Sequence, residues 1–317
     1  MMRNPVQPFL EQFGFFVLDG ALASEMERRG ADLNDPLWSA KVLLESPELI
    51  RQVSLDYFLA GADISVSSTY QATFEGFAKR GLSADAARRL FHQSVRLIQE
   101  ARDAFWAVPA SRGGRLRPLV GASVGPYGAY LANGAEYTGD YDLSESALAD
   151  FHRPRMVALA ESEPDLFCFE TIPSFRELNA LVNLLSEFPD LTAWMSFSTA
   201  GTDRLADGTP FQKAVEVAAR SPQIIAVGVN CLAPQNVLPL LRLAAEVTDK
   251  PLLAYPNSGE KWDAANHCWL PADETADFGM LARQWFDAGA RLIGGCCRTS
   301  MKEIAQIRAV LSQIQTA

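Results

Sequence analysis

The sequence predicts a single (β/α)8 barrel that spans residues 1–317 as one domain. Two observations predict this fold. Eight short apolar segments alternate with eight longer segments in which apolar residues recur three and four positions apart. Polar residues also collect directly after the apolar segments, on the face where such barrels carry their active sites. An open, doubly wound sheet would show the same alternation, but eight repeats close naturally into a barrel.

The expected strands are short runs of aliphatic and aromatic residues, as buried parallel strands are. They are Phe15–Leu18, Asp63–Ser67, Leu119–Val124, Leu166–Phe169, Thr192–Ser198, Ile224–Val229, Leu252–Tyr255 and Arg291–Ile293. The segments between them have the apolar stripe of amphipathic helices. They are Pro47–Ala60, Ala84–Ala107, Glu145–Ala160, Phe175–Glu187, Pro210–Arg220, Gln235–Val247, Thr275–Ala288 and Met301–Ile314.

Residues at the helix ends support these boundaries. Ser174 precedes Glu177 by the spacing of a capping box, in which each side chain bonds the backbone of the other residue. The other signals are first-turn prolines, a second capping box and C-terminal glycines. They are Ser46-Pro47, Thr209-Pro210, Ser300 with Glu303, Gly61 and Gly289.

The composition argues against several kinds of partner. The net charge is −10 and the isoelectric point is near 4.9, whereas nucleic-acid binding needs a basic patch. No polybasic anchor is present, and no run approaches the roughly 18 apolar residues of a membrane span. The N-terminus lacks the apolar stretch of a signal peptide. We therefore expect a cytoplasmic protein with no nucleic-acid or membrane partner.

Three of the five cysteines form the most informative pattern. Cys231 ends the run AVGVNC, and Cys296 and Cys297 end the run RLIGGCC. If both runs are parallel strands of one barrel, their carboxyl ends lie on the same face and the three thiolates can converge. Three thiolates form the ligand set of a catalytic zinc site with one open position, and soft sulfur ligands favour zinc over magnesium or calcium. An odd number of cysteines in an intracellular chain makes a disulfide framework a poor alternative. We expect one Zn²⁺ per chain.

The turn that carries the adjacent cysteines should suit this role. Gly294 and Gly295 would give the backbone the freedom that two adjacent ligands need. The N-terminus of the following helix and the charge of Arg298 would stabilise thiolates. The alternatives are that Cys231 is an ordinary core residue and that the adjacent cysteines form a disulfide with each other or are simply buried.

Polar residues also follow other predicted strands. Glu170 comes directly after the apolar run LFCF, where an unpaired carboxylate would be costly, so an ammonium partner is plausible. The alternatives are a helix-start charge for Glu170 and a turn-forming Asp-Gly pair for Asp19. The full set of strand-end residues is Asp19, Thr69, Glu170, Asn230 and Asn257.

The remaining cysteines and histidines add no expected ligand. Cys168 falls in a core strand, and Cys268 is a bystander in a Trp-rich loop. We expect structural or solvated positions for the three histidines, which are His92, His152 and His267.

An open position on zinc can take a substrate thiol. A free thiol has a pKa near ~8.5, and zinc ligation deprotonates it. The thiolate can then attack an activated methyl group without a side-chain base, which fits the shortage of histidines.

The whole chain resembles the homocysteine S-methyltransferases, which are zinc-dependent (β/α)8 barrels that make methionine. The motifs that carry the resemblance are LDGALASEMERRG, STYQAT, GVNC, YPNSGE and GGCCRT, at Leu18–Gly30, Ser68–Thr73, Gly228–Cys231, Tyr255–Glu260 and Gly294–Thr299. The pair GVNC and GGCC is specific to this family, which includes betaine-dependent relatives and the homocysteine module of cobalamin-dependent methionine synthase.

The resemblance implies a role for each matching residue. Cys231, Cys296 and Cys297 would bind zinc and, through it, carry catalysis. Asp19 and Glu170 would bind the amino group of L-homocysteine. Asn230 would orient Cys231 or the zinc-bound sulfur, and the further substrate contacts that we expect are Thr69, Ser123, Glu136 and Tyr127.

The segment Ser123–Tyr141, SVGPYGAYLANGAEYTGDY, is similar to enzymes whose methyl donor is S-methylmethionine and, less efficiently, S-adenosylmethionine. It crowds four tyrosines with Glu136, and aromatic faces attract sulfonium cations. The alternative is a surface loop whose tyrosines pack on the barrel rim. The tyrosines are Tyr127, Tyr130, Tyr137 and Tyr141.

The chain departs from some relatives at its C-terminal end. It stops soon after the last expected helix, without the extension that betaine-using relatives use to oligomerise and without folate or cobalamin modules. We therefore expect a monomer that transfers a methyl group from a sulfonium donor to the zinc-activated thiol of homocysteine. The alternatives are methylation of another thiol or a selenol, such as selenocysteine, and a non-catalytic zinc-binding or redox-sensing barrel.

Overall fold

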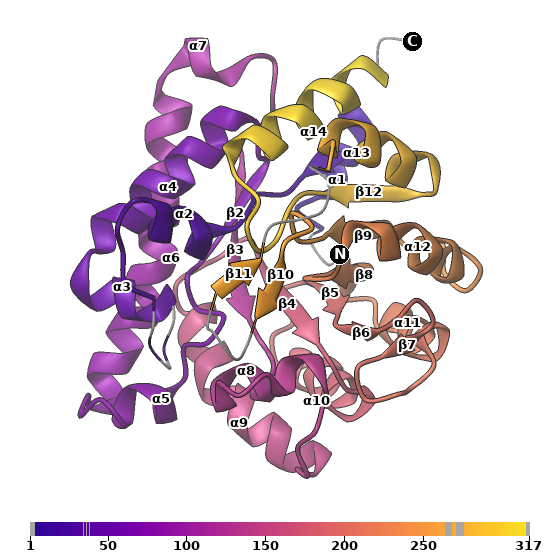
Figure 1. The fold of residues 1–317 in the computed structure, drawn as a ribbon. Helices are drawn as coiled ribbons and strands as arrows, with labels where there is room; N and C mark the ends of the chain where they lie inside the picture. The colour runs from indigo at the N-terminus through magenta and orange to yellow at the C-terminus, as the bar shows by residue number, and fades with distance from the viewer. Residues whose placement is uncertain are drawn as a thin grey trace.

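The main sheet is a ring of parallel strands. The computed structural model describes residues 4–314, except 34, 36, 38, 264–267 and 271–275. Eight strands pair in the order β1-β12-β9-β8-β5-β4-β3-β2, which follows the chain once around the ring, and helices surround it (Figure 1). This order confirms the (β/α)8 barrel. The doubly wound sheet is wrong, because its strand order would reverse direction.

The strands lie close to their predicted positions. They are β1 Phe16–Val17, β2 Ile64–Val66, β3 Leu119–Val124, β4 Leu166–Ile172, β5 Ala193–Phe197, β8 Ile224–Asn230, β9 Leu252–Tyr255 and β12 Ala290–Ile293. Two strands run past their predicted ends, so Glu170 and Asn230 lie inside strands and their side chains are fixed by the sheet.

Backbone and side-chain hydrogen bonds close the seam between β1 and β2, the two ends of the hydrogen-bonded order. The Asp63 amide donates to the Val17 carbonyl at 2.7 Å, and the Asp63 carboxylate accepts from the Val17 amide at 2.9 Å. Nearer the carboxyl ends, the Val66 amide donates to Asp19 Oδ2 at 3.0 Å. Asp19 is therefore both a strand-end residue and part of the barrel closure.

The helices of the repeats pack on the outside of the ring. They are α4 Pro47–Ala60, α6 Ala84–Ala107, α9 Glu145–Ala160, α10 Phe175–Leu185, α11 Phe211–Arg220, α12 Val237–Ala245, α13 Phe278–Asp287 and α14 Met301–Ile314. Of the predicted bounds, those of α4, α6, α9 and α14 are confirmed at both ends. The predicted start of α13, Thr275, lies outside the described residues.

Some of the predicted helix caps form and others do not. Ser174 caps α10 by accepting from the Glu177 amide at 3.2 Å, and Gly61 ends α4 in the left-handed conformation, as predicted. The predicted Thr209 cap is wrong, because Pro210 occupies the N-cap of α11 and no side chain bonds there. Ser46 is the N-cap residue of α4 without a side-chain bond.

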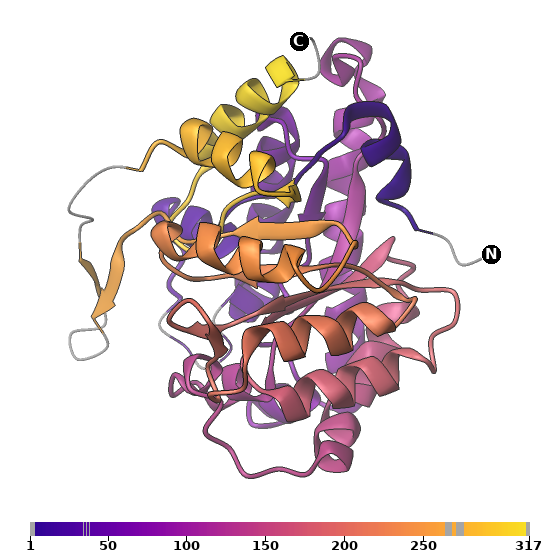
Figure 2. The ribbon, with the colours of Figure 1, turned by 90° about the vertical axis from the view of Figure 1, so that its right-hand side faces the viewer.

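The connections contain short elements that the sequence did not predict. They are α1 Gln7–Phe13, α2 Leu22–Arg28, α3 Ser39–Glu45, α5 Phe74–Ala78, α7 Pro109–Arg112, α8 Tyr127–Leu131, η1 Ala135–Tyr137, η2 Pro234–Asn236 and the hairpins β6 Thr199–Ala200 with β7 Arg204–Leu205 and β10 Lys261–Asp263 with β11 Cys268–Leu270. The hairpin β10–β11 projects from the side of the barrel opposite α1 (Figure 2).

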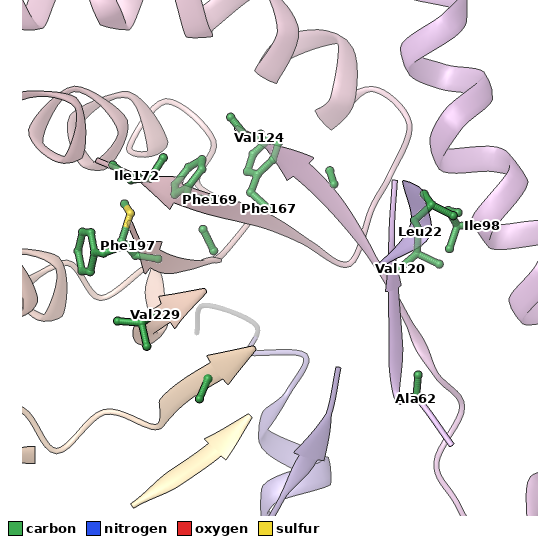
Figure 3. Packing of buried hydrophobic residues seen from close by; sticks show 14 of the residues in the cluster. Leu22, Ala62, Ile98, Val120, Val124, Phe167, Phe169, Ile172, Phe197 and Val229 are labelled. Atoms are coloured by element: carbon green, nitrogen blue, oxygen red, sulfur yellow. The ribbon is translucent and has the colours of Figure 1, made fainter. Parts of the chain in front are cut away.

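Alternation along the strands separates two cores. In β4, Phe167 and Phe169 point outward and pack with residues of neighbouring strands and helices (Figure 3). Leu166 and Cys168 belong to the inner cluster, which Phe9 of α1 joins by packing edge-on against Phe16, with ring centroids 4.9 Å apart. This inner cluster fills the interior of the barrel with apolar side chains. The residues available for binding and catalysis therefore lie at the carboxyl ends of the strands. Within the described parts of the chain, no helix combines the length and apolarity needed to cross a membrane.

Candidate active site

The three predicted thiol ligands converge at the carboxyl ends of β8 and β12. Their sulfur atoms all lie within 4.8 Å of one another, and the Sγ atoms of Cys231 and Cys297 are 3.6 Å apart. Cys231 and Cys296 are paired as a disulfide, whereas Cys297 is a buried thiol. The alternative of a Cys296–Cys297 disulfide is therefore wrong. Disulfide sulfurs carry no thiolate charge, so the pairing and a three-thiolate metal site are mutually exclusive states of one cluster.

Close packing dictates the two glycines before the adjacent cysteines. A Cβ on Gly294 would lie 2.5 Å from Leu18 Cβ, and one on Gly295 would lie 2.3 Å from Thr299 Oγ1. Neither glycine has a positive φ, so the expected conformational freedom is wrong and lack of space is the reason for glycine. The left-handed residues beside the cluster are instead Cys231, with φ of 53°, and Arg298, with φ of 69°.

The environment of Cys297 disfavours a free thiolate. Burial raises the pKa of the Cys297 thiol to about 12, and the negative charge of Glu136 adds to the effect. The charge of Arg298 lowers the Cys297 pKa, as expected, but this effect is smaller than that of burial. The guanidinium is also paired with two carboxylates, because it donates to Glu260 at 2.6 Å and contacts Glu27 at 3.2 Å. A bound cation is the group that would make three thiolates stable here. The donor set, three sulfurs within reach of one point, fits a soft divalent metal.

Asp19 and Glu170 form a buried carboxylate pair on the same face. Only 6% of Asp19 and 8% of Glu170 are exposed. Burial raises the pKa of each to about 7, and the Asp19 pKa is further raised by the charge of Glu170. Ser123 Oγ donates to Glu170 Oε2 at 2.5 Å, which only partly offsets the burial. Such a pair favours a cation, because a cation between the carboxylates lets both ionise.

Thr69 and Ser123 lie beside this pair in different ways. Ser123 contacts Glu170 directly, whereas Thr69 Oγ1 donates to the Ser123 carbonyl at 2.7 Å and lies 2.7 Å from Ser67 Oγ. Thr69 is fully buried, and its bond to the Ser123 carbonyl fixes the backbone of the residue that contacts Glu170.

Asn230 links the carboxylates to the thiols. Its Oδ1 accepts from the Thr171 amide at 2.8 Å and from Ser196 Oγ at 2.7 Å. Its Nδ2 donates to Thr171 Oγ1 at 2.8 Å and lies 3.9 Å from Cys296 Sγ. The carboxamide therefore approaches Cys296 rather than Cys231. Ser196 Oγ also lies 2.5 Å from the Tyr255 hydroxyl, which itself reaches Glu170.

Ser196 and Tyr255 are site residues that the sequence reasoning missed. Both follow an inward-facing aromatic or aliphatic residue by two positions, Trp194 and Leu253. Counting in twos along the strands from these core residues would have placed them on the inner face.

The predicted donor segment covers the same face. The ring of Tyr127 packs in an aromatic cluster with Tyr130, Tyr141 and Phe151, at centroid distances of 5.6, 5.4 and 4.9 Å. Tyr137 is 46% exposed. Of the predicted donor residues, Glu136 and Tyr137 both interact electrostatically with Cys297, and the charge of Glu136 raises the Cys297 pKa. Among the described residues no hydrogen-bond partner reaches Glu136 Oε2, although this atom is shielded from solvent.

The other histidines and cysteines take structural positions where they are described. His152 is buried and Cys168 belongs to the inner barrel core, whereas His92 is partly exposed near Glu161. Cys268 lies in β11, and His267 lies outside the described residues.

Comparison with known proteins agrees with this geometry. A family model described as homocysteine S-methyltransferase matches residues 16–311. The homocysteine S-methyltransferase YbgG of Bacillus subtilis (strain 168) is 49% identical over 313 residues, which are 99% of each chain. Crystal structures of the homocysteine methyltransferase MmuM of Escherichia coli match with a TM-score of 0.87 at 44% identity. The metallated form covers 96% of this chain and 99% of that one, and the oxidised form 97% and 99%. The chain therefore belongs to the homocysteine S-methyltransferase family.

Proposed function

We propose that this methyltransferase moves a methyl group from a sulfonium donor, S-methylmethionine or S-adenosylmethionine, to the thiol of L-homocysteine, giving methionine. The observation that carries the proposal is the placement of three convergent thiols beside two buried carboxylates on one barrel face. Membership of the family makes the chain an enzyme, so a non-catalytic zinc-binding or redox-sensing barrel loses its support.

Cys231, Cys296 and Cys297 are the proposed ligands of one Zn²⁺. When bound there, zinc would lower the pKa of a substrate thiol so that the sulfur attacks as a thiolate. The chain's own part is to hold the three sulfurs close together. A reducing compartment such as the cytoplasm would keep Cys231 and Cys296 unpaired.

Asp19 and Glu170 are the proposed partners of the homocysteine ammonium. Each carboxylate is held by the protein from the side, Asp19 by the Val66 amide and Glu170 by Ser123. An ammonium group bound between them would stabilise the ionised form of both carboxylates. The substrate would thus supply the positive charge that balances the pair.

Glu136 is the proposed recognition group for the donor's positive sulfur. Its shielded carboxylate oxygen has no protein partner among the described residues, and burial raises its pKa. The Tyr127 ring packs into the rim and fits a supporting role more readily than direct contact. Methyl transfer converts the donor's sulfonium to a neutral thioether. The attraction to Glu136 is then lost, which favours release of the demethylated donor.

A donor panel tests the proposal. The reduced, zinc-loaded protein is incubated with homocysteine and, in separate reactions, S-methylmethionine, S-adenosylmethionine, betaine or methylfolate, and methionine is measured. We expect the fastest turnover with S-methylmethionine. Faster turnover with betaine or methylfolate than with either sulfonium, or full turnover by metal-stripped protein, would refute it.

A further inference from the structure

A buried charged network lies behind the donor segment, away from the thiols and the carboxylate pair. Its members are Glu177 at the start of α10 and His152 and Arg155 of α9. Glu177 and His152 are fully buried, and Arg155 is 1% exposed. Burying two formal charges costs several kcal/mol per ion unless they are paired and hydrogen-bonded, so a network of this kind calls for a reason.

The Glu177 carboxylate binds both ends of the donor segment. Its Oε1 accepts from the Tyr127 amide at 2.7 Å and from His152 Nε2 at 2.7 Å. Its Oε2 accepts from the hydroxyl of Tyr141. The capping-box spacing had suggested a bond back to Ser174, but the carboxylate turns to these three tertiary partners instead.

Arg155 holds the segment at a third point. Its Nη2 donates to the Gly125 carbonyl and to His152 Nδ1, the latter at 2.7 Å. Because a guanidinium can only donate, His152 Nδ1 accepts and the ring proton sits on Nε2, which donates to Glu177. Burial, and then the charge of Arg155, lowers the His152 pKa to about 4, so the ring is neutral and its tautomer is fixed.

The held end of the segment packs directly on Glu136. Tyr127 begins α8, and a Cβ on the next residue, Gly128, would lie 2.5 Å from the Glu136 amide nitrogen. There is no slack between α8 and η1, so a shift of α8 moves the Glu136 backbone. The path from the network to the proposed donor contact therefore runs from Glu177 through the Tyr127 amide and Gly128 to Glu136.

We propose that Glu177 is a positioning residue for the methyl donor: it fixes both ends of residues 125–141, with His152 and Arg155, and so sets where Glu136 meets the sulfonium. The inference rests on the proposed donor role of that segment. None of the three network residues contacts the thiols or the carboxylate pair in the hydrogen bonds and ion pairs of the described residues, so homocysteine binding should be independent of them.

The test is Glu177→Gln, assayed as zinc-loaded enzyme at a temperature where it is folded. A neutral amide offers one acceptor oxygen where the carboxylate serves three donors, so we expect the donor KM to rise at least about tenfold. The dissociation constant of homocysteine, measured without donor by calorimetry, should stay within about twofold, and the zinc content should stay at one per chain. Equal weakening of both substrates, or an unchanged donor KM, would overturn the inference.

Two further variants make the result decisive. Glu187→Gln removes an exposed ion pair between Arg153 of α9 and the turn that follows α10, and it should change neither constant. If Glu177→Gln does not fold, Tyr141→Phe removes only one donor to the carboxylate and should raise the donor KM severalfold, again without an effect on homocysteine. Wild-type protein that uses no sulfonium would contradict the proposed function itself. A wild type that uses one, with an unchanged donor KM in the variants, would contradict only the role of Glu177.

Discussion

The carboxamide of Asn230 holds Thr171 in the left-handed region of backbone space. Thr171 has a φ of 61°, an unfavourable conformation for a β-branched residue, and Asn230 bonds both its amide and its hydroxyl at 2.8 Å. Thr171 directly follows Glu170, and the same carboxamide lies 3.9 Å from Cys296 Sγ. One side chain thus ties the proposed ammonium end of the site to the proposed metal end.

Asn230→Ala should damage both stability and homocysteine binding. Three buried groups lose a partner, the Thr171 amide, the Thr171 hydroxyl and the Ser196 hydroxyl, and the free energy of unfolding should fall by about 2–4 kcal/mol. Thr171 can then relax and carry Glu170 with it, so kcat/KM for homocysteine should fall at least about tenfold. Urea unfolding and steady-state kinetics measure the two effects. Asn183→Ala, on the exposed face of α10, is the control, and an equal loss there would contradict the argument.

Loss of any one thiol of the cluster should strongly weaken metal binding. Serine in place of Cys231, Cys296 or Cys297 leaves two sulfurs, and we expect metal affinity to fall at least ~100-fold, since even an outer hydrogen-bond partner of a ligand contributes 10–100-fold. Elemental analysis after dialysis gives the metal content. Cys168→Ala, inside the barrel core, is the matched control and should keep the metal. A Cys297→Ser protein with a full complement of zinc would remove Cys297 from the ligand set.

Oxidation should compete with metal at the same cluster. Because the Cys231–Cys296 disulfide takes two of the three proposed ligands, mild oxidant should release the metal and stop turnover, and dithiothreitol with added zinc should restore both. Metal release is followed with a chromogenic chelator. In Cys168→Ala the same cycle should run unchanged, and metal that stays bound after the disulfide has formed would contradict a shared site.

The barrel and the thiol cluster could be predicted from the sequence because their signals are local. Each strand is a short apolar run, and Cys231 and Cys297 each come shortly after the end of such a run. The inward positions of Ser196 and Tyr255 were not apparent, because strands buried on both faces show no alternation of polar and apolar residues. Counting in twos finds these positions only after the structure has shown which core residues face inward.

The tertiary partners of the Glu177 carboxylate also could not be predicted from the sequence. Its spacing from Ser174 predicts a capping box, and the cap from Ser174 does form. The destination of its carboxylate depends on α8 and α9, which precede it in the chain by many residues and reach it only in the folded barrel. The sequence holds no local signal for such a tertiary choice. The same is true of Gly294, because its close neighbour Leu18 is distant in the sequence. The close neighbour of Gly295, Thr299, is by contrast near it in the sequence.

The seam residue Asp63 should matter for stability and not for the site. It is fully buried between Arg308 and Arg115 and accepts from the Val17 amide at 2.9 Å. Asp63→Ala leaves two cationic side chains without their carboxylate partner, so we expect a loss of about 3–5 kcal/mol in the free energy of unfolding. The KM for homocysteine, measured below the lowered melting temperature, should remain within about twofold. A large change in KM with little loss of stability would contradict the assignment.

Ionisation of Asp19 should lower the stability of the fold while providing a charge for substrate binding, so both should depend on pH. Burial raises its pKa from 3.8 to about 7, so between these values the folded state holds a proton that the unfolded state has released. The contribution of Asp19 to the free energy of unfolding therefore falls as pH rises from about 4 to 7, and at pH 8 its ionised, buried carboxylate is fully destabilising. Asp19→Asn keeps an acceptor for the Val66 amide but cannot ionise, so it should be more stable than wild type at pH 8, by roughly 2–4 kcal/mol, and similar to it at pH 4.

The same substitution should nearly abolish homocysteine binding, because it removes one of the two charges that would pair with the ammonium group. In the wild type, homocysteine affinity should weaken as pH falls below about 7, where Asp19 and Glu170 take up protons. Denaturant unfolding and calorimetry across pH 4–8 check both effects, with the exposed Asp150→Asn as the control. An Asp19→Asn protein that is less stable than wild type at pH 8 yet binds homocysteine normally would mean that Asp19 serves the seam alone.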